Sequence, residues 1–359
     1  MPAIHWLVVR QAVQRLAVRS DSSLREVHIE ESSMTSDTNV QQALPASWAR
    51  ICLVAGRAWS LPASITPVAF GTVLAITIGG AAFDLPLFLL SLLGMALLQV
   101  GANMINDVYD YRNGIDRQVN PASGAVVRGW ITPRQALVGS ATCIAVGSTI
   151  GFYIVSRVGM PILCLGAVGV LGGILYTWGP WPLKYHALGD LAVFLNFGVL
   201  GALGAWTVQT GRLSWVPVVW AVPMSLLVIA ILHSNNWRDI CSDTDGRIRT
   251  VASCLGDAGS QTYQKVLLFA PFTIIVLLVL LTHVTALSPR RPATFLITLL
   301  AMPLAVRLAR TGAGRHDPQK SHAFAAMDGA TAQLNLLFGL LCVAVCLGIW
   351  WLVTRGEAE

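Results

Sequence analysis

Long, uninterrupted apolar segments recur through nearly the whole of this sequence, and they constrain the fold more than any other feature. About 17–25 predominantly apolar residues are enough for a helix to cross a lipid bilayer. Such segments lie at 62–82, 85–105, 135–156, 159–177, 187–208, 214–235, 264–286, 292–309 and 331–353. They are continuous rather than alternating, which excludes a membrane β-barrel. We therefore expect an all-α, polytopic membrane protein with about nine transmembrane helices.

The composition agrees with this prediction. Of the 359 residues, 55% are hydrophobic and only 12% are charged, whereas a soluble domain carries roughly 25% charged residues. The seven cysteines show no spacing typical of a metal site or a redox pair. The net charge of +6 needs no nucleic acid to explain it.

The positive charges are divided unequally between the two sets of loops. An odd number of spans places the termini on opposite sides of the membrane. If the N-terminus is inside, the outer loops and tail hold little beyond Arg157, Arg212, Arg290, Arg291 and Arg355. Cytoplasmic loops normally carry the excess of Lys and Arg, so the sequence predicts an N-in, C-out orientation. The inner loops then carry Arg112, Arg117, Arg128, Arg134, Lys184, Arg238, Arg247, Arg249, Arg310, Arg315 and Lys320.

The chain is predicted to have two parts. Residues 1–50 are polar and lack the long apolar core of a secretory signal, so we expect a flexible N-terminal extension over 1–50 and a transmembrane domain over 51–355. Two long, acid-bearing inner loops, 106–134 and 236–262, follow the second and the sixth predicted helix. This placement predicts two four-helix units in tandem plus one final helix. Repeats of this kind usually place the working site at their junction.

The first acidic loop begins within "NMINDVYDYRNGID". Asn103, Asn106, Asp107 and Asp110 are spaced 0, 3, 4 and 7, and these offsets form one stripe on a helix. Asp116 follows across Gly114, which permits a turn that returns its carboxylate.

The second acidic loop, "HSNNWRDICSDTDGRIRT", repeats this composition. Asn235, Asp239 and Asp243 are spaced 0, 4 and 8, and Asn236 lies three residues before Asp239. The pattern again predicts one stripe of amide and carboxylate oxygens at a helix end. Asp245, in contrast, is expected to be an ordinary solvated helix-end residue.

Aligned carboxylates repel one another, and a half-buried carboxylate is costly without a partner. Hard oxygen ligands suit Mg²⁺, which often bridges carboxylates to substrate phosphates. Helix capping and solvation would explain either stripe alone, but two similar stripes on one membrane face favour a site. We predict Asp107, Asp110, Asp239 and Asp243 as catalytic residues. The predicted metal ligands are Asn103, Asn106, Asp107, Asp110, Asp116, Asn235, Asn236, Asp239 and Asp243.

A bound diphosphate would also need cationic groups from the protein. Arg57 lies near the motifs, and we predict diphosphate binding by Lys184, Arg112, Arg128, Arg238 and Tyr185. Two alternatives stay open. Lys184 could be a lysine that extends to the membrane edge. The aromatic residues around it could form an interfacial belt or shield a carbocation; they are Tyr176, Trp178, Trp181 and Tyr185.

At these residues the sequence resembles the UbiA superfamily of intramembrane prenyltransferases. The resemblance covers about residues 50–353, through "NMINDVYDYRNGID", "SNNWRDICSDTDGRIRTVASCLG", "GILYTWGPWPLKYHALGDLAVFLNFG" and "AWSLPASITPVAFGTVLA". It implies that Mg²⁺ and basic residues bind the diphosphate of a polyprenyl donor. The donor would ionise to an allylic cation, and an electron-rich ring carbon of an aromatic acceptor would attack that cation.

Within the superfamily, several details look like the branch that prenylates 1,4-dihydroxy-2-naphthoate, with loss of CO₂, in menaquinone biosynthesis, and like its animal relative. They are Asn103 four before Asp107, the "GID" that closes the first motif, the run from Asn235 to Asp243, and "VVRGWITPRQAL". "TVASCLG" and "DTDG" depart from the usual runs of the superfamily without removing a ligand.

The resemblance leads us to expect a Mg²⁺-dependent naphthoate polyprenyltransferase in a bacterial inner membrane, with its active site facing the cytoplasm. An alternative is the same chemistry on another acceptor, such as 4-hydroxybenzoate, homogentisate, a chlorophyllide, a glyceryl phosphate or a natural-product phenol. A remote alternative is a divalent-cation transporter. Transporters place acids near mid-bilayer, whereas the predicted helix interiors here are nearly free of acids.

Overall fold

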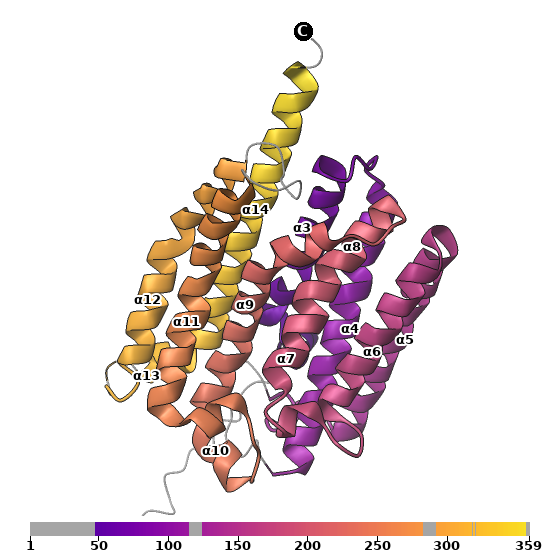
Figure 1. Cartoon of the computed structure of the whole chain (residues 1–359). Helices are drawn as coiled ribbons and strands as arrows, with labels where there is room; N and C mark the ends of the chain where they lie inside the picture. Colours follow the sequence, from indigo (N-terminus) through magenta and orange to yellow (C-terminus); the bar gives the residue numbers. More distant parts are fainter. Residues whose placement is uncertain (1–46, 115–123, 283–291, 318, 320, 357–359) are drawn as a thin grey trace, which may run out of the picture. The chain divides into compact units, whose positions relative to one another are not determined.

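The computed structural model describes residues 47–114, 124–282, 292–317, 319 and 321–356, and these residues are helical almost throughout (Figure 1). No strand separates the helices among the described residues. Their bounds are α2 (Trp48–Ala55), η1 (Ala58–Ser60), α3 (Pro62–Thr77), α4 (Leu85–Arg112), α5 (Pro133–Val158), α6 (Met160–Thr177), η2 (Leu183–Tyr185), α7 (Gly189–Val193), the π-helical turn η3 (Phe194–Val199), α8 (Leu200–Thr210), α9 (Trp215–Arg238), α10 (Ile240–Asp245), α11 (Val251–Thr282), η4 (Pro292–Ala301), α12 (Met302–Ala313), α13 (Ser321–Ala325) and α14 (Met327–Gly356).

Nine helical segments in the described part of the chain are long and apolar enough to cross a membrane. This confirms the predicted all-α, polytopic class and the number of spans. The N-in, C-out orientation stays a prediction. So does the boundary between an extension over 1–50 and a domain over 51–355, because residues 1–46 lie outside the described part; α2 already begins at Trp48.

The acidic loops are shorter than the sequence predicted, because helices continue into them. Helix α4 runs on to Arg112 and carries Asp107 and Asp110 within its last two turns. Helix α11 begins at Val251 and is interrupted at Gly256, which has φ 67°. We attribute the continuation of α4 to the partners of its two acids, described below, which remove the cost of turning carboxylates inward.

Side chains that cap the helix ends explain several of the observed starts. The carboxylate of Asp84 accepts the backbone N–H of Leu87 at 2.9 Å at the start of α4. At the start of α5, Thr132 and Gln135 cap one another's backbone N–H groups. These bonds satisfy amides that have no partner within the helix.

The spans form two neighbouring groups, α3 to α8 and α9 to α14, which are drawn in indigo to pink and in red to yellow in Figure 1. The last span, α14, packs against the first, α3. Thr66 of α3 donates a hydrogen bond of 3.0 Å to Asn335 of α14. In the second group, Gln264 of α11 donates one of 2.9 Å to Ser234 of α9. In lipid no hydrophobic driving force acts between helices, and such interhelical bonds add to van der Waals packing in holding the helices together.

Two glycines allow the closest helix contacts. A Cβ atom on Gly71 would lie 2.2 Å from the carbonyl oxygen of Ala202, so α3 and α8 meet backbone to backbone. A Cβ on Gly198 would lie 2.0 Å from the hydroxyl of Ser225, where η3 meets α9. Small residues permit this approach in membrane helices.

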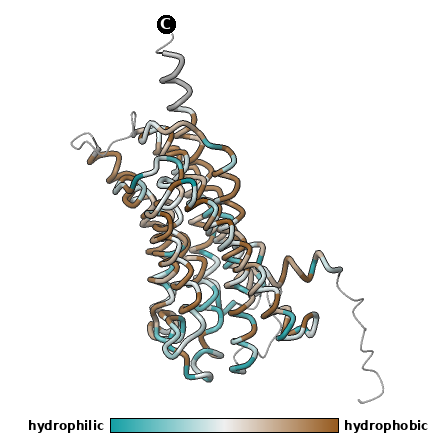
Figure 2. Tube along the Cα trace, turned by 90° about the vertical axis from the view of Figure 1, so that its right-hand side faces the viewer, coloured by the Kyte–Doolittle hydropathy of each residue, from teal (hydrophilic) through white to brown (hydrophobic). Residues whose placement is uncertain are grey.

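Hydrophobic residues cover most of the helical bundle, and hydrophilic residues gather at one end (Figure 2). That end includes α10 and the last turns of α4, in the lower part of Figure 1. Both acidic motifs therefore lie at the same end of the bundle.

Candidate active site

The first acidic motif lies on the last turns of α4, and its side chains point into the protein. Asn106, Asp107 and Asp110 are all buried. Asp107 accepts the backbone N–H of Val126 at 3.3 Å through Oδ2. Its Oδ1 accepts no hydrogen bond, and the Arg57 guanidinium lies 3.9 Å from it. A buried carboxylate oxygen without a hydrogen-bond partner is costly, so this atom is suited to a further cationic ligand.

Lys184 joins this motif from the short helix η2. Its ammonium donates a hydrogen bond of 2.6 Å to Asn106 Oδ1 and forms an ion pair with Asp110. Asn106 in turn donates to Asp110 Oδ2 at 3.0 Å. Lys184 is largely buried, with 13% of its side chain exposed. This position excludes the alternative of a lysine extended to the membrane edge.

Asn103 has a different environment from its neighbours in the stripe. Its amide donates to the Gly56 carbonyl at 3.0 Å and to the Ser60 hydroxyl at 3.3 Å. It therefore fixes the turn before α3. That turn holds Arg57, whose φ of 48° is left-handed and rare for a residue with a side chain.

The second acidic motif occupies the end of α9 and helix α10. Arg238 is the centre of its hydrogen bonds, donating to Asn235 at 2.5 Å and to Asp239 at 3.0 and 3.1 Å. Asp243 is buried and accepts from the Thr250 hydroxyl at 3.3 Å. Burial raises the pKa of Asp243 to about 7; the Asp239 carboxylate also raises it, Lys184 opposes, and Asp110 raises it further.

The two motifs meet around one cavity of about 120 Å³. Its wall includes Asn103 and Asn106 from the first motif and Asn235 and Asn236 from the second. Arg57, Lys184 and Tyr176 line the same cavity. A backbone hydrogen bond also connects the two motifs: the Ala187 N–H donates to the Arg249 carbonyl at 2.5 Å and so joins the turn that carries Lys184 to the second acidic loop.

Some predicted residues lie elsewhere. Arg112 is exposed, 5.9 Å from the Tyr109 ring. Arg128 lies 4.9 Å from the Trp130 ring, and burial together with Arg50 lowers its pKa. Tyr185 accepts from Asn113 at 3.1 Å through its hydroxyl. None of these three lines the cavity. The same is true of Arg238 and of the four predicted catalytic carboxylates, Asp107, Asp110, Asp239 and Asp243, so each motif reaches the cavity through its asparagines. Asp116 lies outside the described residues.

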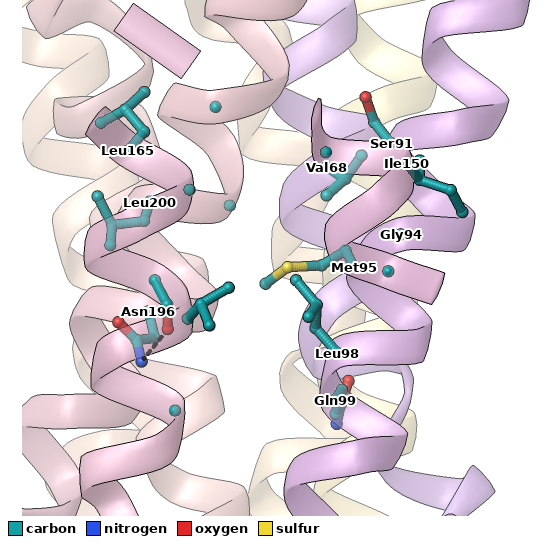
Figure 3. Close-up of a pocket in the computed structure, with 18 of the residues that line it drawn as sticks. Val68, Ser91, Gly94, Met95, Leu98, Gln99, Ile150, Leu165, Asn196 and Leu200 are labelled. Atoms are coloured by element: carbon teal, nitrogen blue, oxygen red, sulfur yellow. Dashed lines mark hydrogen bonds between the residues drawn. The ribbon is translucent and has the colours of Figure 1, made fainter. Parts of the chain in front are cut away.

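A second, apolar cavity of about 190 Å³ adjoins the first, because Gln99, Ala102, Gly173, Asn196 and Phe197 line both. In Figure 3, Leu165, Asn196 and Leu200 form one wall of this apolar cavity, and Val68, Met95 and Leu98 form the other. A polar chamber that opens into an apolar one suits a ligand with a charged head and a hydrocarbon tail.

The donor set fits Mg²⁺ bound partly through water. Among the described residues, no three acidic, His or Cys side chains form a ready metal-binding group. The cavity wall itself offers the amides of the two motifs and no carboxylate. The carboxylates lie on the same two helix ends, and Oδ1 of Asp107 accepts no hydrogen bond although the Arg57 guanidinium lies 3.9 Å from it. Mg²⁺ typically keeps several waters and takes one or two carboxylates plus substrate phosphates.

The profile of the UbiA prenyltransferase family matches residues 64–337 of this chain. The chain belongs to the UbiA prenyltransferase family. It is 34% identical over 293 residues to UbiA prenyltransferase domain-containing protein 1 of Danio rerio, covering 81% of this chain and 82% of the relative. The protein of that name from Homo sapiens is 33% identical over 314 residues, covering 86% and 88%.

Solved structures support the same UbiA fold. A UbiA homologue from Archaeoglobus fulgidus bound to GPP and Mg²⁺ superposes with a TM-score of 0.58 at 15% identity, covering 82% of this chain and 99% of that chain. A digeranylgeranylglyceryl phosphate synthase superposes with a TM-score of 0.52 at 16% identity, covering 84% and 99%. At such identities the likeness concerns the fold alone.

These comparisons correct the expected function. The prediction of 1,4-dihydroxy-2-naphthoate prenylation in menaquinone biosynthesis is wrong, because the relatives from Danio rerio, Mus musculus and Homo sapiens are UbiA prenyltransferase domain-containing protein 1 and not naphthoate enzymes. That assignment rested largely on the two Asn- and Asp-bearing motifs, which were predicted to bind the metal and the diphosphate and so do not identify the acceptor. The relatives named here are animal proteins and lend no support to a bacterial inner membrane.

Proposed function

We propose that this UbiA-family protein transfers a prenyl group from a prenyl diphosphate to an aromatic or lipid acceptor, with Mg²⁺ as cofactor. The observation that carries the proposal is the shared cavity, which brings Asn103 and Asn106 together with Asn235 and Asn236 beside Lys184. A solved homologue of the same fold was bound to GPP and Mg²⁺, which supports both the ligand class and the metal.

The residues that would hold Mg²⁺ are the oxygen-bearing side chains of the two motifs. They are Asn103, Asn106, Asp107, Asp110, Asn235, Asn236, Asp239 and Asp243. When bound, Mg²⁺ supplies positive charge that stabilises the diphosphate as it leaves. At acidic pH Asp243 must lose a proton before it can act as a ligand, since its pKa in the protein without metal is about 7.

Arg57 would bind the diphosphate directly. Lys184, whose ammonium donates to Asn106 and to both carboxylate oxygens of Asp110 in this arrangement, would do so once Asp110 serves as a metal ligand. Both line the cavity, and both side chains are largely buried, with 13% exposed. The Arg57 Nε–H has no hydrogen-bond partner and can donate to a phosphate oxygen. Charge-assisted hydrogen bonds from fixed cations are strongest where water is excluded.

The adjoining apolar cavity would receive the prenyl tail. It is lined by aliphatic and glycine residues together with Met95 and Phe197, and its polar members are Ser91, Gln99 and Asn196. The C–O bond of the allylic diphosphate would break, the acceptor would form a bond to the released carbon, and the acceptor would give up a proton. Exclusion of water protects the allylic cation from hydrolysis.

The acceptor would enter beside aromatic side chains. Trp59, Tyr176 and Phe197 line the polar cavity, and an aromatic face stabilises a nearby cation by about 0.5–2 kcal/mol. We also propose that this end of the bundle faces the cytoplasm, as the basic inner loops predict.

Product analysis tests the proposal. Purified protein in lipid nanodiscs is incubated with geranylgeranyl diphosphate, Mg²⁺ and a panel of phenols, quinols and glyceryl phosphates, and products are read by mass spectrometry. We expect a product equal to the acceptor plus the prenyl group minus one hydrogen. The proposal would be contradicted if folded, Mg²⁺-loaded protein gave no prenylated product with any acceptor of the panel and instead moved divalent cations across vesicle membranes.

A further inference from the structure

Arg238 uses every hydrogen-bond donor that its side chain has. A guanidinium carries five N–H groups. Nε donates to Asp239 at 3.0 Å, Nη1 to Asp328 at 2.8 Å and to the Ala325 carbonyl at 3.2 Å, and Nη2 to Asn235 at 2.5 Å and to Asp239 at 3.1 Å. No N–H of Arg238 is left for a diphosphate oxygen in this arrangement. Arg238 therefore holds neighbouring side chains rather than a substrate.

Asp328 contributes to this arrangement from a distant part of the sequence. It lies in the first turn of α14, ninety positions after Arg238. Only 2% of its side chain is exposed, and its Oδ1 accepts the N–H of Gly329 at 2.8 Å. The buried carboxylate is thus fixed in position and directed at the guanidinium.

The charges around Arg238 do not cancel. One guanidinium lies between two carboxylates, Asp239 and Asp328, so the group carries one net negative charge. Asp328 is buried, whereas 35% of the Asp239 side chain is exposed. If Asp328 were absent, Arg238 would neutralise Asp239 alone, and Asp239 would attract a cation less strongly.

We propose that Asp328 is a positioning residue for the metal site. It neutralises Arg238 and orients it, so that Asn235 is held in place and the charge of Asp239 stays available for Mg²⁺. This inference rests on the proposed Mg²⁺-dependent transfer and assigns a role in it to the last span. Groups that hold metal ligands in place commonly change metal affinity by about 10- to 100-fold.

The test measures metal binding as well as turnover. Full-length protein in nanodiscs, with a fixed concentration of non-cleavable geranyl thiodiphosphate, is titrated with Mn²⁺, and free Mn²⁺ is read by electron paramagnetic resonance. For Asp328→Asn, which has nearly the same shape, we expect the apparent Kd for Mn²⁺ to rise roughly tenfold or more. The KM for geranylgeranyl diphosphate at saturating Mg²⁺ should change by less than about twofold.

Two variants make the test specific. Asp328→Glu keeps the negative charge and should restore most of the Mn²⁺ affinity. Asp245→Asn removes one carboxylate from an exposed position of the second loop and should leave the Mn²⁺ affinity unchanged. If Asp328→Asn does not fold, Asp328→Ser, which leaves room for water beside the guanidinium, replaces it in the same titration.

The outcomes separate this inference from the proposed function. Suppose that the wild type binds Mn²⁺ and transfers the prenyl group, and that folded Asp328→Asn has the same Mn²⁺ affinity. This result overturns the inference and leaves the proposed function intact. A loss of affinity that Asp245→Asn reproduces also overturns it, because the effect is then one of net charge. Wild-type protein that neither binds Mn²⁺ nor turns over refutes both.

Discussion

Lys184 donates a hydrogen bond of 2.6 Å to Asn106, and this bond fixes the turn between α6 and α7 against the first acidic motif. The ammonium also pairs with Asp110. A cation is thereby held at the wall of the polar cavity before any substrate arrives. Preorganised charge of this kind costs no rearrangement when the leaving group develops its own charge.

Replacing Lys184 by Gln tests its part in binding the diphosphate. Loss of a charge-assisted hydrogen bond to a phosphate oxygen should raise the KM for geranylgeranyl diphosphate by roughly 10- to 100-fold. The measurement is steady-state kinetics at saturating Mg²⁺. Lys265→Gln, at an exposed position of α11, should retain the wild-type KM; equal effects of the two substitutions would refute a specific contact.

Asp107→Asn and Asp239→Asn test the metal role of the two motifs. Each removes one carboxylate at nearly constant shape, and each should lower turnover by more than about 100-fold. EDTA should abolish turnover of the wild type, and added Mg²⁺ should restore it. A folded double variant that still turns over would show that the carboxylates are not needed for metal binding.

The pH dependence of metal binding follows from Asp243. Its pKa is raised from 3.8 to about 7 by burial and by Asp239, so below pH 7 the carboxyl is mostly protonated in the protein without metal. Mg²⁺ needs the ionised form, and its affinity should therefore fall as pH decreases, by up to about tenfold between pH 7 and pH 6. Calorimetric Mg²⁺ titrations from pH 6 to pH 8.5 measure the trend. Asp243→Asn should bind Mg²⁺ weakly at every pH; a steep dependence that persists in that variant would assign it to another group.

The apolar cavity predicts a limit on the prenyl tail. A Cβ atom on Gly204 would meet no atom within 4 Å, and this residue lines the cavity. Gly204→Leu should therefore fill cavity space and lower kcat/KM for geranylgeranyl diphosphate by about tenfold, while geranyl diphosphate remains a substrate. Competition between the two donors, with products separated by mass, measures the change. Gly348→Leu, at an exposed position of α14, should not alter the ratio, and a parallel loss with both donors would argue against the tail assignment.

The sequence predicted the spans and the two motifs because both depend on local pattern. Apolar length alone located the nine membrane-spanning segments in the described part of the chain. The spacing of Asn103, Asn106, Asp107 and Asp110 is helical, and α4 continues through all of them. The error lay in expecting a loop there, since the partner that permits the helix to continue, Lys184, lies 74 positions from Asp110.

Contacts between segments that are far apart along the chain could not be predicted from one sequence alone. Nothing near Asp328 marks it as the partner of Arg238 across 90 positions. Arg57 was noted only as a nearby cation, and its place at the cavity follows from a left-handed turn that the Asn103 amide holds. The acceptor was misassigned because the motifs carry the residues predicted to bind metal and diphosphate, whereas the choice of acceptor depends on the shape of the chamber.

The contact between the first and the last span has a consequence for biogenesis. Thr66 of α3 receives its partner Asn335 only after α14 has left the ribosome and entered the bilayer. Helix α14 also carries Asp328, the carboxylate that pairs with Arg238. Neither contact can form until α14 is inserted, so the arrangement around Arg238 is completed late in the synthesis of the chain.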